Sequence, residues 1–395
     1  MPLQSAVSIE DLRRLARRRL PDFLFAPMDA GAGEGAGAAR NVRRLSEHLL
    51  LPRALVDVGN RITTKSIFGR EYASPFGISA IGYAGNFRRH ADLLLAESAR
   101  VANVPFILSG ASTSAIESVA RVAPDHVWYQ LYGANDRGLT DDMVKRARDA
   151  GTGVLVFTVD FPVAPRVEKL MRTGVRPPGR VPLHSMPYVL WEMLKHPAWC
   201  LDFVRQGGPA KLESWQRYAR GGASAAAIAR IYAAQVPSAQ TWHDLEHLRG
   251  IWPGKLIVKG LLHPEDAKLA LTLGADGVTV SNHGGVKLDC LPATIDVLDS
   301  VVSAVEGKIP VFFDGGIRCG AHVLIALCRG AAFCFVGRAA LHGVSAAGRA
   351  GADRALQILR EEISNTLAMV GCPSIAELGP QFIADAASGP RRRAR

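Results

Sequence analysis

Residues 311–318 read VFFDGGIR, and residues 333–338 read FCFVGR. In each stretch a short apolar run is followed by glycine and then by arginine. A short apolar run bounded by glycine is typical of a strand that is buried on both faces. Buried strands of this kind that alternate with helices indicate an α/β protein with a parallel sheet.

The same kind of apolar run occurs eight times from residue 75 onward. The predicted strands are Pro75–Ala80, Pro105–Gly110, Val127–Tyr132, Val154–Asp160, Leu256–Gly260, Gly277–Asn282, Val311–Gly315 and Phe333–Gly337. Helical patterns lie between them at Ala91–Ala102, Asp141–Ala150, Pro264–Leu273, Thr294–Val305 and Ala321–Arg329. Eight strands that alternate with helices predict a closed (β/α)8 TIM barrel rather than an open doubly wound sheet.

We expect residues 1–385 to form one barrel domain, which includes an N-terminal segment and a loop insertion. An N-terminal helical segment, residues 8–50, should begin with a basic amphipathic helix over residues 8–20 that Ser8 and Asp11 cap. Residues 26–39 are rich in glycine and alanine and are expected to form a loop. Residues 386–395 form a basic tail.

The loop after the fourth strand is expected to be a long insertion, residues 161–240. Apolar and aromatic residues recur at helical spacing in residues 189–194 and 199–204. One interpretation is an extra helix that packs on the barrel. The other is a surface that contacts a membrane or a partner, because tryptophan and basic residues beside an apolar face suit a lipid interface.

Composition excludes several classes of protein. Hydrophobic residues make up 48% and charged residues 21% of the 395 residues, with a net charge of +11. The basic runs lie near the ends, at residues 13–19 and 391–395, so we expect no nucleic-acid interface. We expect no secretory signal or membrane span, which favours the cytoplasm. Six cysteines without a C-x-x-C pair indicate buried reduced thiols and no metal site: Cys200, Cys290, Cys319, Cys328, Cys334 and Cys372.

Polar residues gather at the carboxyl ends of the predicted strands, where barrels of this kind place their active sites. They are Ser109, Gln130, Tyr132, Thr158, Asp160, Lys259, Ser281, Asn282, His283, Asp314 and Arg338. Burying so many polar groups is costly unless a ligand or mutual pairing satisfies them. This pattern predicts a ligand site over the mouth of the barrel.

The last two units predict a phosphate site. Gly315, Gly316 and Arg318 follow the seventh strand, and Gly337 and Arg338 follow the eighth. Glycine lets the backbone N–H groups approach a phosphate, and arginine adds bidentate charge. The alternative is a pair of tight turns with surface arginines.

His283 follows the sixth strand and is a candidate general base, because imidazole titrates near neutral pH. Asp160 is the candidate partner that would fix its tautomer. Lys259 ends the fifth strand and could stabilise negative charge on a reduced ring system. The alternative for Asp160 and Lys259 is a mutual ion pair at the barrel rim.

Together these motifs identify a resemblance to a known family. The stretches are QLY at 130–132, TVD at 158–160, VKG at 258–260, SNHGG at 281–285, DGGIR at 314–318 and GR at 337–338. They resemble the FMN-dependent α-hydroxy acid dehydrogenases and oxidases, from about residue 8 to residue 385. Residues 196–205 and 252–255 are most similar to its mandelate dehydrogenase members, in which the long loop contacts the membrane.

The resemblance implies FMN as the cofactor and assigns residues to it. The residues implied to line the flavin ring, the ribityl chain or the phosphate are Ala80, Ile81, Gly82, Ser109, Gln130, Thr158, Lys259, Ser281, Asp314, Gly315, Gly316, Arg318, Gly337 and Arg338. Lys259 would face the N1/O2 edge of the flavin, and both arginines would hold the phosphate.

The resemblance also implies the chemistry. His283, supported by Asp160, would take the substrate proton while two electrons pass to FMN, and Tyr132 would bind the substrate oxygen. The implied partners are a small-molecule substrate and an electron acceptor such as oxygen or a quinone. A homotetramer and a peripheral contact of residues 161–240 with the inner face of a membrane are implied as well.

The chain departs from the family where the substrate carboxylate is bound. The family uses a tyrosine and two arginines, and the corresponding positions here hold Pro27, Val167 and Val286. Valine cannot replace bidentate arginine. One hypothesis is a hydroxy acid dehydrogenase whose carboxylate clamp is rebuilt from Arg166 and Lys287.

Two further hypotheses remain open. The same flavin machinery could act on a compound without a free carboxylate, such as an amine, an ester or a biosynthetic intermediate. Alternatively, the barrel could bind a flavin or another phosphate ligand and carry out an isomerase-type reaction or none.

Overall fold

The computed structural model describes residues 2–175, 181–205, 207–236 and 239–384, so the predicted basic tail lies outside it. Eight parallel strands close into a barrel in the order β10, β3, β4, β5, β6, β7, β8, β9. They are β3 (Phe76–Ile78), β4 (Phe106–Leu108), β5 (Val127–Leu131), β6 (Val154–Thr158), β7 (Lys255–Leu261), β8 (Gly277–Val280), β9 (Val311–Asp314) and β10 (Phe333–Val336). The predicted TIM barrel is therefore confirmed.

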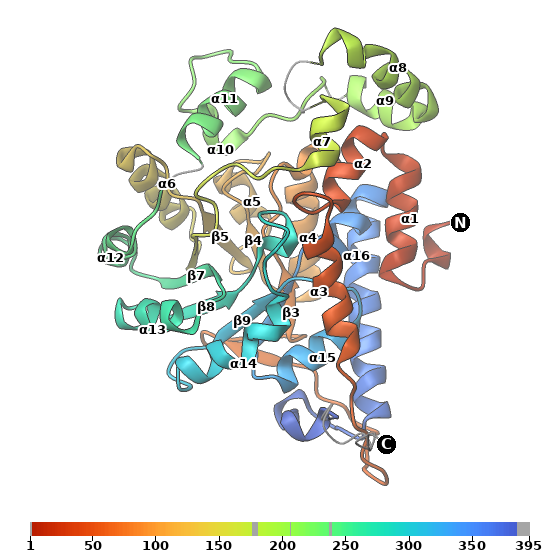
Figure 1. Cartoon of the computed structure of the whole chain (residues 1–395), viewed down its shortest axis with the longest axis vertical. Coiled ribbons are helices and arrows are strands. Elements are labelled where there is room, and N and C mark those ends of the chain that lie inside the picture. Colours follow the sequence, from red (N-terminus) through yellow and green to blue (C-terminus); the bar gives the residue numbers. More distant parts are fainter. Residues whose placement is uncertain (1, 176–180, 206, 237–238, 385–395) are drawn as a thin grey trace, which may run out of the picture.

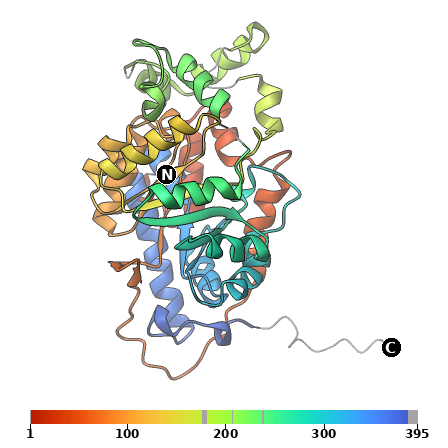
Figure 2. The same cartoon turned by 90° about the vertical axis from the view of Figure 1, so that its left-hand side faces the viewer.

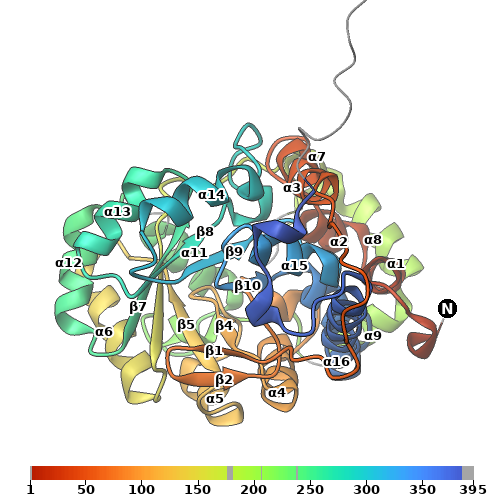
Figure 3. The ribbon, with the colours of Figure 1, turned by 90° about the horizontal axis from the view of Figure 1, so that it is seen from below.

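Large side chains fill the inside of the barrel. Trp128 packs against Phe312 and Phe335, with ring centroids 5.9 and 5.4 Å apart. The strands β1 (Lys65–Ile67) and β2 (Arg70–Tyr72) form an antiparallel hairpin. It lies at the lower end of the barrel, which faces the viewer in Figure 3. Its turn residue Phe68 contacts Trp128 and Phe312, so the hairpin closes this end and leaves the opposite end for the ligand site.

Helices surround the strands on the outside (Figures 1 and 2). They are α4 (Ala91–Ala102), α5 (Ile116–Val122), α6 (Arg137–Asp149), α12 (Trp242–Ile251), α13 (Pro264–Thr272), α14 (Thr294–Ala304), α15 (Gly320–Cys328) and α16 (Arg338–Met369). All five helical patterns expected from the sequence are present, with ends that shift by a few residues. Each helix has a buried apolar stripe, and α16 packs along α1, α4 and α15.

The N-terminal segment confirms one prediction and corrects another. Helix α1 (Ile9–Arg19) begins at the expected capping box of Ser8 and Asp11 and packs along α16. The prediction of a loop over residues 26–39 holds for residues 30–35 and is wrong on either side, because α2 (Asp22–Asp29) and α3 (Ala36–Glu47) extend into this range. Small residues are needed there for close packing: a Cβ on Gly37 would lie 3.0 Å from the backbone oxygen of Asp289.

The described part of the insertion after β6 forms α7 (Glu168–Thr173), α8 (Met186–Lys195), α9 (Pro197–Arg205), α10 (Glu213–Gln216) and α11 (Ala225–Gln235). Figure 1 shows these helices at the top of the molecule. Trp199 of α9 packs on Phe23 of α2 at 5.9 Å, and the Glu192 carboxylate of α8 accepts a 2.7 Å hydrogen bond from the Asp22 N–H. One face of this pair therefore packs on the N-terminal segment.

Two global features follow from the described residues. None of their helices is long and apolar enough to cross a membrane. All six cysteines are free thiols, but Cys290 is exposed, which corrects the expectation that the thiols are buried. The residue lies in the loop between β8 and α14, outside the packed layers.

Candidate active site

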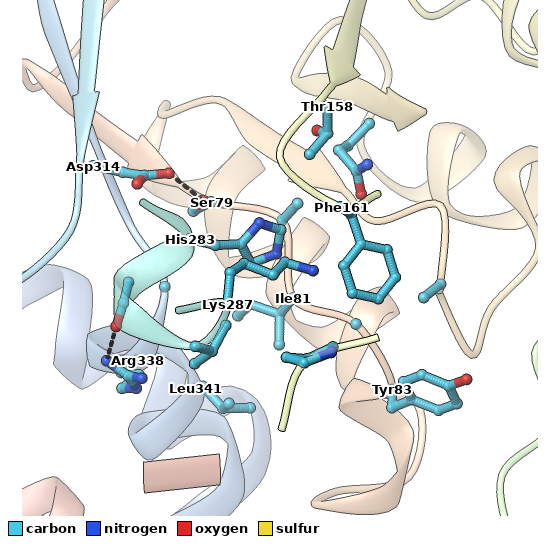
Figure 4. A pocket seen from close by; sticks show the side chains of 18 of the residues that line it. Ser79, Ile81, Tyr83, Thr158, Phe161, His283, Lys287, Asp314, Arg338 and Leu341 are labelled. Carbon is cyan, nitrogen blue, oxygen red and sulfur yellow. Dashed lines mark hydrogen bonds between the residues drawn. The ribbon is translucent and has the colours of Figure 1, made fainter. Parts of the chain in front are cut away.

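A cavity of about 480 Å³ opens at the carboxyl ends of the barrel strands. Figure 4 shows His283 and Lys287 between an end with Arg338 and Leu341 and an end with Phe161 and Tyr83. A volume in this range suits a small-molecule ligand or an organic cofactor. Among the described residues, no three His, Cys, Asp or Glu side chains gather in a way that could hold a metal ion.

His283 stands at the centre of a hydrogen-bonded group. Its Nδ1 lies 3.0 and 3.1 Å from the two carboxylate oxygens of Asp160, and its Nε2 lies 3.2 Å from the Tyr132 hydroxyl oxygen. The backbone of His283 has a φ of 56°, in the left-handed region that non-glycine residues rarely adopt. With Nδ1–H donated to Asp160, the Nε2 lone pair faces the Tyr132 side of the cavity.

The electrostatics keep this imidazole neutral at neutral pH. Burial, together with the cations Lys287 and Lys259, lowers the pKa of His283 to about 4, although Asp160 opposes the shift. Burial raises the pKa of Asp160, but the charge and hydrogen bond of His283 and the two lysines outweigh it and lower that pKa to about 2. The pair at pH 7 is therefore a neutral imidazole and an ionised carboxylate.

Lys259 and Asp314 form a second, deeper group. The Lys259 Nζ lies 3.0 Å from Asp314 Oδ2 and donates to the Ser281 hydroxyl at 2.8 Å. That hydroxyl donates in turn to Asp314 Oδ1 at 2.6 Å. The alternative of a mutual pair between Asp160 and Lys259 is wrong, because each has another partner.

Two polar atoms on the cavity wall lack a partner. Gln130 Nε2 and Thr158 Oγ1 are buried and make no hydrogen bond to any described residue. Ser109 lies behind Gln130 and donates to its Oε1 at 3.2 Å, whereas Ala80, Ile81 and Gly82 line the cavity directly. Unpartnered buried groups are costly, so this wall fits a ligand with a hydrogen-bonding edge.

The other end of the cavity fits an anion. Arg318 and Arg338 line it beside the first turn of α16, whose N-cap residue Gly337 provides no side-chain hydrogen bond. No carboxylate in the described ranges lies within ion-pair distance of either guanidinium, and burial and the charge of Arg338 lower the pKa of Arg318 to about 10. Two arginines without an acidic partner at a helix N-terminus match a phosphate group.

The glycines of this end allow a left-handed backbone and a close approach of neighbouring chain. Gly315 and Gly316 have φ values of 104° and 90°, and a Cβ on Gly316 would lie 2.7 Å from the Asn41 backbone. Three backbone oxygens, from Met28, Ala30 and Gly284, accept hydrogen bonds from Arg338. The N-terminal segment is thereby tied to the anion-binding end.

The structure separates the two residues expected to rebuild the carboxylate clamp. Lys287 lines the cavity, with its ammonium 3.0 Å from the centre of the Phe161 ring. Arg166 is exposed and does not line the cavity, and its backbone oxygen accepts from the Gly33 N–H. Pro27 and Val286 line the cavity, whereas Val167 pairs with Gly33 away from it.

Several lining residues were not predicted from the sequence. They are mainly apolar or aromatic: Met28, Tyr83, Phe87, Phe161, Ala164, Pro165, Tyr232, Ala233, Val236 and Leu341. Tyr83 and Phe161 follow predicted strands closely, so their position could have indicated them. Tyr232 and Val236 belong to α11 and the residue after it, and nothing in their local sequence indicates that the insertion folds back over the barrel.

The comparisons with known proteins agree with this geometry. The family model of FMN-dependent dehydrogenases matches residues 16–385. The (S)-mandelate dehydrogenase of Pseudomonas putida is 36% identical over 382 residues, which cover 96% of this chain and 94% of that protein. An L-lactate dehydrogenase of Vibrio cholerae serotype O1 is 34% identical over 368 residues, with coverages of 93% and 96%.

Solved structures show the same similarity. The monotopic membrane protein (S)-mandelate dehydrogenase matches with a TM-score of 0.91 and 35% identity, covering 96% of this chain and 100% of that one. An arginine-to-leucine variant of mandelate oxidase with 2-hydroxy-phenylacetamide matches with a TM-score of 0.79 and 31% identity, with coverages of 96% and 98%.

Proposed function

Because the chain belongs to the family of FMN-dependent dehydrogenases, we propose that it oxidises the C–H(OH) centre of a small α-hydroxy compound with His283 as the base. The observation that carries this proposal is the position of His283. Its Nε2 is 3.2 Å from the Tyr132 hydroxyl at the cavity, and Asp160 holds the opposite nitrogen at 3.0 Å. This is the arrangement that a general base and its orienting carboxylate require.

Bound FMN supplies a two-electron acceptor. The residues of the chain hold the substrate and move its proton. His283 accepts the substrate proton at Nε2, and the Asp160 carboxylate stabilises the imidazolium that forms. Tyr132 donates a hydrogen bond to the substrate oxygen and keeps it next to the base.

The cofactor fits the residues that remain. Gln130 and Thr158 would satisfy their unpartnered atoms on the polar edge of the flavin ring, beside Ala80, Ile81 and Gly82. Lys259 would place its charge at this wall, fixed by Asp314 and Ser281. Arg318 and Arg338, with Gly315, Gly316 and Gly337, would hold the phosphate at the start of α16.

The substrate's side group would occupy the apolar end of the cavity. Tyr83, Phe161, Tyr232 and Val236 line this end, and Tyr83 and Tyr232 meet edge to face at 6.0 Å. Aromatic walls favour a flat apolar group. We infer that a compound with a phenyl-sized group fits better than one with a methyl group.

The insertion supports a second proposal, a peripheral contact with a lipid surface. Side chains of this region that face solvent are Leu183, Leu190, Trp191, Leu194, Leu201 and Val204, which are 49–89% exposed. Lys195 and Arg205 are exposed beside them. An apolar face with tryptophan and adjacent cations suits the headgroup boundary of a bilayer, and one similar structure is that of a monotopic membrane protein.

Anaerobic mixing tests the main proposal. The purified protein should show flavin absorbance, and addition of mandelate should bleach it faster than addition of lactate. His283→Ala should retain the flavin but lose the bleaching, because the variant lacks the imidazole that is proposed to take the proton. A colourless protein that takes up no added FMN would contradict the redox function, and unchanged bleaching in His283→Ala would contradict the assignment of the base.

A further inference from the structure

One cation at the substrate end of the cavity has no acidic partner. Lys287 lies two residues beyond the turn His283–Gly285, and its Nζ is 3.0 Å from the Phe161 ring centre and 5.7 Å from that of Tyr132. In the part of the chain that the structure describes, no carboxylate lies within ion-pair distance of this ammonium. The contact with the aromatic faces stabilises the cation without neutralising it.

The other charged groups that face this space are already paired. Asp160 bonds to His283, and Lys259 bonds to Asp314. Tyr132 is un-ionised, since burial raises the pKa of its phenol far above neutral pH. Arg318 and Arg338 stand at the opposite, phosphate end, and Arg166 does not line the cavity. An anionic group beside His283 would therefore find Lys287 as its counter-charge.

The surroundings of Lys287 also favour loss of the proton from its ammonium group. Burial lowers the pKa of Lys287 to about 7, with Lys259 adding to the shift and Asp160 opposing it. The side chain is consequently a mixture of ammonium and amine near neutral pH. A bound carboxylate would favour the ammonium, whereas a neutral ligand leaves the amine free to form.

We propose that Lys287 determines which class of α-hydroxy compound this enzyme accepts. As an ammonium it anchors the carboxylate of a 2-hydroxy acid through one monodentate contact. The neutral amide or ester of the same skeleton needs no counter-charge, so it binds whether the side chain is an ammonium or an amine. This inference rests on the proposed function, because it concerns the compound from which His283 removes a proton.

The test compares two compounds that differ only in having a carboxylate or a neutral amide. Mandelate and 2-hydroxy-phenylacetamide share the phenyl group and the hydroxyl, so each is titrated into the FMN-loaded enzyme between pH 6 and pH 9. Perturbation of the flavin absorbance gives Kd, and its bleaching gives the rate. Mandelate should bind up to about tenfold more weakly for each pH unit above 7, while the Kd of the amide should stay nearly constant.

Two variants isolate the lysine. Lys287→Met should weaken mandelate binding at pH 6 by about 10- to 100-fold, the effect of one charged hydrogen bond, and leave the amide within about threefold. Lys287→Arg should bind mandelate equally well at pH 6 and pH 9, because a guanidinium does not lose its proton. Lys268→Met on the exposed face of α13 is the matched control.

The outcomes separate this inference from the proposed function. An unchanged ratio of the two Kd values in Lys287→Met, or mandelate that fails to bind the wild type at pH 6, would overturn the role of Lys287. Binding of both compounds with the expected pH dependence but without bleaching would support Lys287 and contradict the role of His283.

Discussion

The low pKa of His283 has a consequence for the pH dependence of the reaction. A base must be neutral to accept a proton, so the rate of flavin bleaching should fall tenfold per pH unit below about pH 4. Above about pH 5 the imidazole of His283 is neutral, and its titration should no longer change the rate. Lys287 is one of the cations that lower this pKa. In Lys287→Met the acid limb should therefore move to higher pH.

Stopped-flow bleaching with the neutral amide measures this shift without the effect of substrate charge. The rate of Lys287→Met at pH 5 should be clearly below its rate at pH 7, whereas the wild-type rates should be similar. Identical acid limbs in the two proteins would show that the lysine does not act on the base.

Asp160 is expected to matter through the tautomer of His283. Asp160→Asn keeps the size of the side chain but removes the charge that stabilises the imidazolium and can turn the ring by donating to Nδ1. Bleaching should slow by about 10²-fold or more, with FMN still bound. Asp149→Asn on the exposed end of α6 should bleach at the wild-type rate. Equal rates for Asp160→Asn and the wild type would contradict this role.

Lys259 and Asp314 form a buried pair, with side chains 4% and 8% exposed, so removal of one partner leaves a buried charge. Lys259→Met should lower the free energy of unfolding by about 3–5 kcal/mol. Addition of Asp314→Asn should recover part of the loss, because the uncompensated carboxylate is then absent. Urea denaturation measures both variants, and a single variant as stable as the wild type would contradict the prediction.

The pair of helices α8 and α9 has one face packed on α2 and another face exposed to solvent. Trp199 and Glu192 face α2, while Leu190, Trp191 and Leu194 face solvent at 54%, 60% and 75% exposure. If these solvent-facing residues contact lipid, the triple variant Leu190→Ser, Trp191→Ser and Leu194→Ser should bind vesicles at least tenfold more weakly. Co-sedimentation with phosphatidylcholine vesicles containing phosphatidylglycerol measures the binding.

The chain offers a matched control for this experiment. Leu49, Leu51 and Leu55 are also 52–106% exposed but lie outside the insertion. Their replacement by serine should leave vesicle binding unchanged. If the two triple variants lose binding equally, or the wild type does not bind, the insertion is not the membrane-contacting element.

Elements with a strong local pattern could be predicted, and elements that depend on distant packing could not. The strands were visible because both faces are apolar, and α1 because Ser8 and Asp11 cap it. The start of α3, residues 36–39, was missed because glycine at position 37 disfavours an isolated helix, although the close approach to Asp289 requires it. The β1–β2 hairpin was missed because its short strands, KSI and REY, are mostly polar and lack the apolar run that marks the barrel strands.

The candidate site shows the same limit. Its polar members end predicted strands, and the geometry of a closed parallel barrel is sufficient to predict that they lie together. The apolar walls come from α2, α11 and α16, and only the folded chain places these elements over one cavity. The separation of Lys287 from Arg166 likewise depends on the path of the loop after β6, which the sequence does not specify.

At the scale of the whole molecule, the cavity proposed to hold FMN is lined by elements from both ends of the chain. FMN at one hundred times its Kd should stabilise the fold by about 2.7 kcal/mol, which raises Tm by several degrees. Riboflavin at the same concentration should raise Tm less, because it lacks the phosphate for Arg318 and Arg338. Differential scanning calorimetry of apoprotein compares the two ligands, and equal shifts would contradict the phosphate site.

The pairing of β10 with β3 has a consequence for biosynthesis. Cys334 aligns with Phe76 where the barrel closes, so 334 − 76 = 258 residues separate the first strand from its last neighbour. At about 5–20 residues per second, a ribosome needs roughly 13–50 s to cover that interval. During this time the nascent chain exposes an unpaired strand edge. Arg318 is made only near the end of the interval, and Arg338 is made just after it. Flavin capture is therefore a late, nearly post-translational event, and a chain that stops before residue 338 should be released without cofactor.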